Sequence, residues 1–242
     1  MALTTRPVCI WFDLDDTLIT TTASLTAAIK ASKAYIEADY PQFSERDIAY
    51  NSMDVWLTEL GPGTEGFTDL SQMNLNAFRS HIVHGTLSRM GIETIDAARL
   101  MECSALAEES AWNCFPGVQK LLEDLQQHGI TLGIISNGPT ALQLRKLSQS
   151  GLVQYFTHIL LDCEVGVSKP DSSIFEAAET LMPNCHHVMI GNDPDADING
   201  AIRAKWTAFW FTPGWDGETK PTEVGYIPIQ HHSEIFEYLT KG

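Results

Sequence analysis

From residue 116 onward, short apolar runs alternate with stretches whose apolar residues recur at helical spacing. In the first such stretch, Val118, Leu121 and Leu125 fall on one face of a helix that Gly129 ends. Strands are expected near 130–135, 159–161, 187–190 and 207–211, and helices near 140–150, 170–181 and 195–205. This alternation predicts a parallel sheet covered on both faces by helices. The expected fold class is α/β, with a doubly wound, Rossmann-like core.

The region from about residue 20 to residue 113 has no strand signal and a helical pattern. Helices are expected near 23–38, 45–60, 69–90 and 94–113, and the glycine-rich segment Gly61–Gly66 is expected to be a loop. The apolar strand Val8–Phe12 precedes this block. We therefore predict a catalytic core of residues 1–18 and 115–242, with a helical cap of residues 19–114 inserted after its first strand. Such an insertion lies near the carboxyl ends of the strands, where ligands bind, and is placed to act as a lid.

Two carboxylates follow directly on the first apolar strand. Asp13 and Asp15 are two residues apart, so in extended chain their side chains point to the same side. One carboxylate can attack a substrate while the other moves a proton, and a cation can be held between them. The pattern predicts phosphoryl transfer or metal-assisted hydrolysis.

Polar residues also follow three later strands. Ser136-Asn137-Gly138 offers a hydroxyl and backbone N–H groups at the start of a helix, which suits a phosphate oxygen. Lys169 brings a cation to the place where negative charge would build up. Asn192, Asp193 and Asp197 supply oxygen ligands for a hard cation such as Mg²⁺. Together these strand ends predict a phosphate site.

The charge of the chain restricts its partners. There are 31 acidic and 15 basic residues, and no basic stripe of the kind that nucleic-acid binding needs. No apolar run approaches the ~18 residues of a membrane span, and no signal segment is seen at the N-terminus.

The five cysteines are scattered without a C-x-x-C pair, so we expect free thiols and a cytoplasmic protein. The sequence leaves the oligomeric state open.

These motifs resemble those of the haloacid dehalogenase (HAD) superfamily of hydrolases. In this order and at these spacings the motifs are specific, although each is weak alone. The matching stretches are Phe12–Leu18, Phe115–Val118, Ile135–Gly138, Ser168–Asp171 and Ile190–Ala201. The helical insertion is similar to the α-helical cap of one branch of that superfamily.

The resemblance implies a role for each site residue. Asp13 would attack phosphorus and form an aspartyl-phosphate, and Asp15 would protonate the leaving oxygen and later activate water. Ser136 would bind phosphate, and Lys169 would steady the charge shared by Asp13 and the phosphate. Asp13, the backbone carbonyl of Asp15 and a residue of the fourth motif would hold Mg²⁺. The presence of Asp15 favours a phosphatase over a dehalogenase, since dehalogenases of this superfamily lack that second aspartate.

The chain departs from the family at two positions. Members usually have Gly-Asp in the fourth motif, where this chain has Gly191-Asn192. Depending on which spacing anchors the match, Asn192 or Asp193 takes the place of the usual metal ligand, and Asp197 is a further candidate. Asp16 stands where many members have glycine, and we expect it to shape the turn without a catalytic role.

We therefore predict a Mg²⁺-dependent phosphatase of a small phosphorylated metabolite, such as a nucleoside monophosphate or a sugar phosphate. One alternative is a phosphomutase on the same core, which would return the phosphoryl group to its substrate. The other is a binding or regulatory protein whose chemistry is weakened by Asn192. Intact Asp13, Asp15 and Lys169 speak against this second alternative.

Overall fold

The computed structural model describes residues 7–214 and 219–241. Within them, one parallel sheet of six strands runs in the order β3-β2-β1-β4-β5-β6. The strands are β1 (Val8–Phe12), β2 (Thr131–Ser136), β3 (His158–Leu161), β4 (His186–Gly191), β5 (Thr207–Phe211) and β6 (Ile227–Ile229). The predicted α/β fold with a parallel sheet is confirmed.

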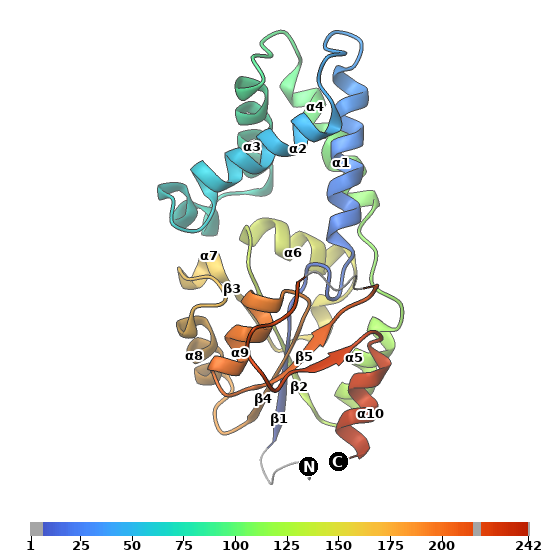
Figure 1. The fold of residues 1–242 in the computed structure, drawn as a ribbon, viewed down its shortest axis with the longest axis vertical. Helices are drawn as coiled ribbons and strands as arrows, with labels where there is room; N and C mark the ends of the chain where they lie inside the picture. Colours follow the sequence, from blue (N-terminus) through green and yellow to red (C-terminus); the bar gives the residue numbers. More distant parts are fainter. Residues whose placement is uncertain (1–6, 215–218, 242) are drawn as a thin grey trace. The chain divides into compact units, whose positions relative to one another are not determined.

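The strand order reverses at β1. The chain steps outward from β1 to β2 and β3, and then crosses back to β4, β5 and β6 on the other side of β1. Because such crossovers are right-handed, the reversal puts helices on opposite faces of the sheet. In Figure 1, α5 (Val118–Gln127) and α10 (Ser233–Lys241) lie together on one face, while α8 (Ser172–Leu181) and α9 (Gly200–Arg203) lie on the other. The ligand crevice of such a sheet lies at this reversal, outside the carboxyl ends of the strands.

The core beneath the site is almost fully apolar. Trp11 packs with Phe175, Ala178 and Trp206 on the face that α8 covers. Gly133 of β2 leaves room for this packing, because a Cβ there would lie 2.5 Å from the Trp11 ring. Strands buried on both faces need no alternation of polar residues, which is why their sequences read as continuous apolar runs.

The helical part of the chain contains four α-helices among the described residues. They are α1 (Thr21–Ile36), α2 (Glu45–Val55), α3 (Leu75–Arg89) and α4 (Ala97–Ser110). Side chains cap three of them at the N-terminus: Ser44 accepts from the Asp47 N–H, Asn74 from Ala77 and Asp96 from Arg99. Such caps satisfy N–H groups that have no partner inside the helix. The apolar faces meet in a separate core that includes Ile36, Ile48, Leu87, Met90 and Leu100.

Several predicted segments differ in detail. The helix expected at 69–90 is interrupted, because a 3₁₀ helix, η2 (Glu65–Ser71), ends before Asn74 caps α3. Gly66 accordingly belongs to η2 and not to the predicted loop. The helices expected at 45–60 and 195–205 each contain a π-helical turn, η1 (Trp56–Leu60) and η4 (Pro194–Asn199). Four short elements were not predicted: β6, α10, α7 (Asp162–Val165) and the 3₁₀ helix η3 (Val153–Tyr155).

The chain divides into two compact units. One comprises Met1–Ile19, Cys114–Asn137 and Leu147–Gly242, and the other comprises Thr20–Asn113 and Gly138–Lys146. The second unit therefore includes the first turns of α6 (Thr140–Gln149) as well as the inserted helices. Its ion pairs explain this: Glu109 of α4 binds Arg79 of α3 at 2.6 Å and Arg145 of α6 at 2.7 Å. The predicted boundaries of core and cap stay a prediction.

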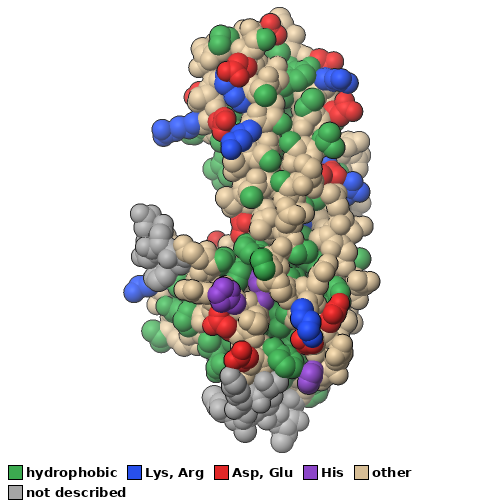
Figure 2. Space-filling model, turned by 90° about the vertical axis from the view of Figure 1, so that its right-hand side faces the viewer, with side chains coloured by type: hydrophobic (Ala, Val, Ile, Leu, Met, Phe, Trp, Pro, Cys, Tyr) green, Lys and Arg blue, Asp and Glu red, His purple; other side chains and the backbone are tan. Residues whose placement is uncertain are grey.

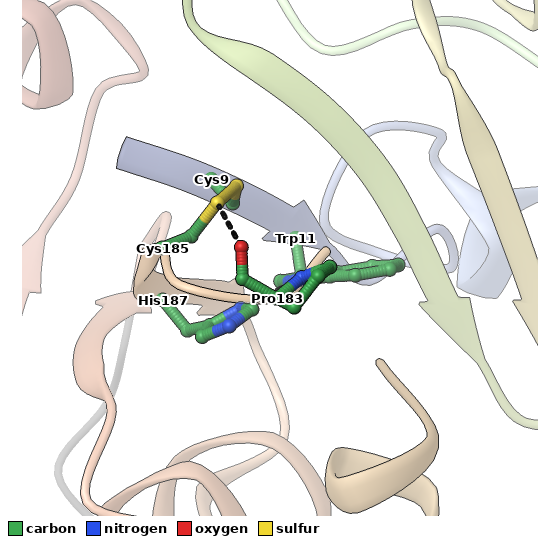
Figure 3. The surroundings of a disulfide bond; sticks show 5 residues. All are labelled: Cys9, Trp11, Pro183, Cys185 and His187. Atoms are coloured by element: carbon green, nitrogen blue, oxygen red, sulfur yellow. Dashed lines mark hydrogen bonds between the residues drawn. A yellow bond between two sulfur atoms is a disulfide. The ribbon is translucent and has the colours of Figure 1, made fainter. Parts of the chain in front are cut away.

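The expectation that all five cysteines are free is wrong for two of them. Cys9 and Cys185 form a disulfide, with 5.9 Å between their Cα atoms. Cys9 lies in β1, and Cys185 precedes β4, which pairs with β1 in parallel, so the fold brings together residues 176 positions apart. Figure 3 shows both cysteines on the side of the strand pair that carries Trp11 and His187, whose side chains are joined by a 3.1 Å hydrogen bond from Trp11 Nε1 to His187 Nδ1. The Cys185 Sγ atom also lies 3.8 Å from the Pro183 carbonyl oxygen.

The surface carries mixed charge. On the face shown in Figure 2, Lys and Arg side chains stand among Asp and Glu side chains. Among the described helices, none has the length and apolar character that crossing a membrane requires. The absence of nucleic-acid binding and the cytoplasmic location stay predictions.

Candidate active site

The site forms where β1, β2 and β4 end at the same edge of the sheet. Asp13 follows β1, and its N–H donates to the Ile190 carbonyl of β4 at 2.9 Å, which fixes the backbone at that point. Ser136 is the last residue of β2 and is fully buried. Asn192 follows β4. The edge therefore gathers the residues that the sequence placed at separate strand ends.

Lys169 is the centre of the site. Its ammonium group donates to Asp13 Oδ1 at 2.6 Å, to Asp197 Oδ1 at 2.6 Å and to the Ile135 carbonyl at 2.8 Å. An ammonium group has three donors, so these three acceptors use all of them. The Lys169 side chain is 2% exposed, and those of Asp13 and Asp197 are 10% and 1% exposed. The structure thus brings together three of the predicted residues in a buried ionic cluster.

Burial and charge act against each other in this cluster. Burial raises the pKa of Asp13 to about 7, because the attraction of Lys169 only partly offsets it and the Asp197 and Asp15 charges add to the rise. The pKa of Asp197 is also raised, by burial first, against the charge of Lys169. Burial lowers the pKa of Lys169, but Asp13 and Asp197 outweigh it, so the net shift is upward. Lys169 is therefore a permanent cation held against carboxylates that are costly to ionise.

Asp197 has a fixed position in the fourth motif. Its Oδ1 atom accepts from Lys169, and its Oδ2 atom accepts from the Asp193 N–H at 2.9 Å. Gly191 permits this arrangement, since a Cβ there would lie 2.3 Å from Asp197 Oδ2. Both carboxylate oxygens of Asp197 thus accept hydrogen bonds from the protein. These contacts favour a role in holding Lys169 over the predicted role as a metal ligand.

Asn192 and Asp193, the two alternatives for the fourth-motif metal ligand, differ in their surroundings. The Asp193 side chain is exposed and caps η4, since its Oδ1 atom accepts from the N–H groups of Asp195 and Ala196. Asn192 is half-buried, and its Oδ1 atom accepts from the Thr17 hydroxyl at 3.1 Å. Asn192 therefore faces the Asp15–Thr17 segment, while Asp193 serves the helix that follows it.

The segment after Asp13 is held by residues that the sequence did not single out. The Thr17 carbonyl accepts a 2.9 Å hydrogen bond from Nε2 of His232, which is buried between the start of α10 and Phe211. Asp16 has φ 53°, in the left-handed region that favours glycine, asparagine and aspartate. The predicted turn role of Asp16 fits this conformation. His232 lies 215 residues from Thr17 in the chain, so no local pattern connects the two.

Asn137 lies at the end of β2, next to Ser136. Its side-chain Nδ2 donates to the Lys169 carbonyl at 3.0 Å, and its Oδ1 accepts from the Lys169 N–H at 2.9 Å. The side chain is thus bound to the lysine loop. Because the side chain is occupied, the predicted phosphate contact of Asn137 would be made by its backbone N–H. The phosphate contacts of Asn137 and Ser136 stay predictions.

The residues present fit a magnesium ion. The charges of Asp15 and Asp197 both act on Asp13, and Lys169 is the cation that opposes them, so the site carries excess negative charge when its three carboxylates are ionised. The Asp13 carboxylate, the Asp15 carbonyl and the Asn192 amide are oxygen donors of the type that Mg²⁺ prefers. This set has a single Asp side chain. No cluster of three or more His, Cys, Asp or Glu side chains that could hold a metal occurs in the described part of the chain.

Comparisons with known proteins agree with the motifs. A family model for haloacid dehalogenase-like hydrolases matches residues 8–205. Glyceraldehyde 3-phosphate phosphatase of Methanothermobacter thermautotrophicus is 30% identical over 204 residues, which cover 82% of this chain and 83% of that protein. Phosphoserine phosphatase of Thermus thermophilus is 26% identical over 188 residues, which cover 76% and 73%. The crystal structure of YfnB from Bacillus subtilis bound to magnesium has the same fold, with a TM-score of 0.68, 22% identity and coverage of 97% and 99%.

Proposed function

This chain belongs to the haloacid dehalogenase-like hydrolases, and on that premise we propose that it is a Mg²⁺-dependent phosphatase of a small phosphorylated metabolite. The observation that supports the proposal is the buried cluster in which Lys169 binds Asp13 and Asp197, beside Asp15. A phosphate monoester is anionic and resists attack, and this cluster supplies a nucleophile with a fixed cation next to it. Relatives named as phosphatases support the same class of reaction.

The first half of the reaction uses both carboxylates of the first motif. A carboxylate oxygen of Asp13 forms a bond to phosphorus while the bond between phosphorus and the leaving oxygen breaks. Asp15, two residues further on and half-buried, gives a proton to that leaving oxygen. The product of this step is an aspartyl-phosphate on Asp13 and a free alcohol.

The second half regenerates the enzyme. The Asp15 carboxylate takes a proton from water, the water oxygen bonds to phosphorus, and the bond between Asp13 and phosphorus breaks. Inorganic phosphate leaves, and Asp13 is again a carboxylate held by Lys169. Asp15 thus acts first as an acid and then as a base.

Positive charge and hydrogen-bond donors at the strand ends receive the phosphoryl oxygens. We assign phosphate binding to the Ser136 hydroxyl and to the Asn137 N–H group at the end of β2. Lys169 steadies the charge shared by Asp13 and the transferred group. Donors held in place before the reaction cost no reorganisation as charge develops.

Mg²⁺ would be held by the Asp13 carboxylate, the Asp15 carbonyl and the Asn192 amide oxygen. When bound, it neutralises the phosphate and offsets the excess negative charge of the carboxylates. We assign the fourth-motif ligand to Asn192, because its amide oxygen lies against Thr17, in the segment that also carries Asp15, whereas Asp193 is exposed and caps η4 and Asp197 holds Lys169. We further propose that residues 19–114 serve as the cap that selects the substrate.

A substrate panel tests this proposal. Phosphate release is measured from nucleoside monophosphates, sugar phosphates, phosphoserine, glyceraldehyde 3-phosphate and phosphoglycolate, with Mg²⁺ and with a chelator. Metal-dependent release of phosphate is expected from at least one class. Isomerised sugar phosphate without phosphate release would favour the phosphomutase, and an absence of both turnover and Mg²⁺ binding would favour a binding protein.

A further inference from the structure

We infer that the Asn137 side chain is a positioning residue, which fixes the backbone of Lys169 and thereby the place of its ammonium group. The inference rests on the proposed function, because Lys169 matters for the charge on Asp13 and on the transferred phosphate. It assigns Asn137 a side-chain role that is separate from phosphate binding by its backbone.

The hydrogen bonds between Asn137 and Lys169 form a matched pair. The side-chain amide donates to the Lys169 carbonyl at 3.0 Å and accepts from the Lys169 N–H at 2.9 Å. An amide side chain carries both a donor and an acceptor, as a peptide group does, whereas a carboxylate only accepts. Asparagine therefore satisfies both backbone groups of Lys169 at once.

β2 and the residue that follows it consequently hold both the ammonium group and the backbone of Lys169. The Ile135 carbonyl of β2 accepts from the ammonium group at 2.8 Å, and Asn137, two residues later, holds the backbone. A lysine side chain is long and has many rotamers, so fixing only its charged end leaves the loop free to shift. With its backbone held by Asn137 and its ammonium group by Ile135, Lys169 is fixed against Asp13 and Asp197.

A second brace acts on the residue before Lys169. Asp162, the first residue of α7 and the residue after β3, accepts from the Ser168 hydroxyl at 2.7 Å and from the Cys163 N–H at 2.7 Å. The Asp162 side chain is buried, at 1% exposure. The segment from Asp162 to Lys169, which includes α7, is thus held at Ser168 by Asp162, which follows β3, and at Lys169 by Asn137, which follows β2.

The test compares Asn137→Ala with Ser168→Ala, which weakens the other anchor, and with Asn51→Ala, which removes an amide from α2. Amide hydrogen exchange of peptides covering residues 162–171 reports the order of the loop independently of activity. Steady-state kinetics on the substrate identified by the panel separates kcat from KM, and competition by inorganic phosphate reports phosphate binding.

A positioning role predicts faster exchange in residues 162–171 and a loss in kcat of about 10- to 100-fold for Asn137→Ala. KM and inhibition by inorganic phosphate are expected to stay within about twofold of the wild type, because no phosphate contact is removed. Ser168→Ala is expected to change both readouts in the same direction, and Asn51→Ala neither.

Unchanged exchange with a raised KM and weaker inhibition by phosphate would overturn the inference and make the Asn137 side chain a phosphate ligand. If the wild type turns over no phosphate ester, the proposed function fails. The exchange measurement still decides the inference in that case, since unchanged exchange in both variants shows that neither side chain orders the lysine loop.

Discussion

Asn192 is the residue at which this chain departs from the usual fourth motif of its family. Its amide oxygen accepts from the Thr17 hydroxyl, which places it against the segment that also carries Asp15. Asparagine ligates a hard cation through oxygen but brings no charge, whereas the affinity of such sites rises with the number of charged ligands. We therefore expect this enzyme to bind Mg²⁺ more weakly than an aspartate at this position would allow.

Asn192→Asp is predicted to tighten Mg²⁺ binding by roughly tenfold, because it adds one negative charge to the ligand set. Titration calorimetry of the protein with Mg²⁺ measures the change. Asp193→Asn removes a charge one residue away and keeps a side chain that can cap η4, so it is expected to leave Mg²⁺ binding near that of the wild type. The reverse result, with Asp193→Asn abolishing binding, would make Asp193 the ligand.

At the residue scale, the sequence predicted which residues form the site, but it did not predict which atoms they contact. Asp13, Lys169 and Asp197 were predicted, and they meet because parallel strands end at one edge. Which oxygen each group binds depends on distances between loops that are far apart in the chain. The hydrogen bonds of Asn137 to Lys169 and of Asp197 to Asp193 therefore could not be predicted from the sequence.

At the scale of elements, the segment at the start of α10 supports the first motif. His232 is buried against Phe115 and Phe211, and its Nε2–H donates to the Thr17 carbonyl. Burial lowers the pKa of His232 to about 4, against a smaller upward effect of the Thr17 hydrogen bond. The His232 ring is therefore neutral in the folded protein at neutral pH.

The protonation of His232 predicts how stability depends on pH. Above pH 6.5 the ring is neutral in the folded and unfolded states, and below about pH 4 it is protonated in both. Between these values only the unfolded state takes up the proton, so stability falls as pH decreases, by roughly 3 kcal/mol at most. Urea unfolding of the wild type and His232→Gln between pH 7.5 and pH 4 checks this prediction. The wild type should lose more stability than the variant, and parallel curves would contradict it.

Two features that were not predicted from the sequence have different physical reasons. β6 is short, contains Pro228 and lies at the edge of the sheet, where proline is tolerated. The π-helical turn η4 has a helical pattern in sequence, and only the backbone shows its wider winding. By contrast, the five other strands were predicted within two residues, because each contains a run of at least three apolar or buried positions at its centre.

At the scale of the whole molecule, the disulfide encloses most of the chain. Cys9 and Cys185 are separated by 176 residues, and the inserted helical unit lies between them in sequence. A cross-link that closes a long loop restricts the unfolded state, and this stabilises the fold by about 2–4 kcal/mol in typical cases. The bond also joins β1 and β4, the two strands that lead to Asp13 and Asn192.

Cys185→Ser is accordingly predicted to lower the free energy of unfolding by about 2–4 kcal/mol under non-reducing conditions. Excess reductant should remove the difference between the variant and the wild type. Thiol titration of the denatured, unreduced wild type is expected to give three thiols, those of Cys103, Cys114 and Cys163. A titration of five would show that the bond is not formed in the isolated protein.

Asp13 is the proposed nucleophile that receives the phosphoryl group, and every later step of the proposed reaction depends on it. The most direct measurement is therefore the rate of phosphate release by Asp13→Asn, with saturating Mg²⁺ and the best substrate of the panel. An amide of nearly the same shape cannot form the acyl-phosphate, so turnover is predicted to fall by at least about a thousandfold. Asp39→Asn, an exposed aspartate in the helical unit, is the matched control and should retain wild-type turnover. Wild-type turnover by a folded Asp13→Asn would contradict the account.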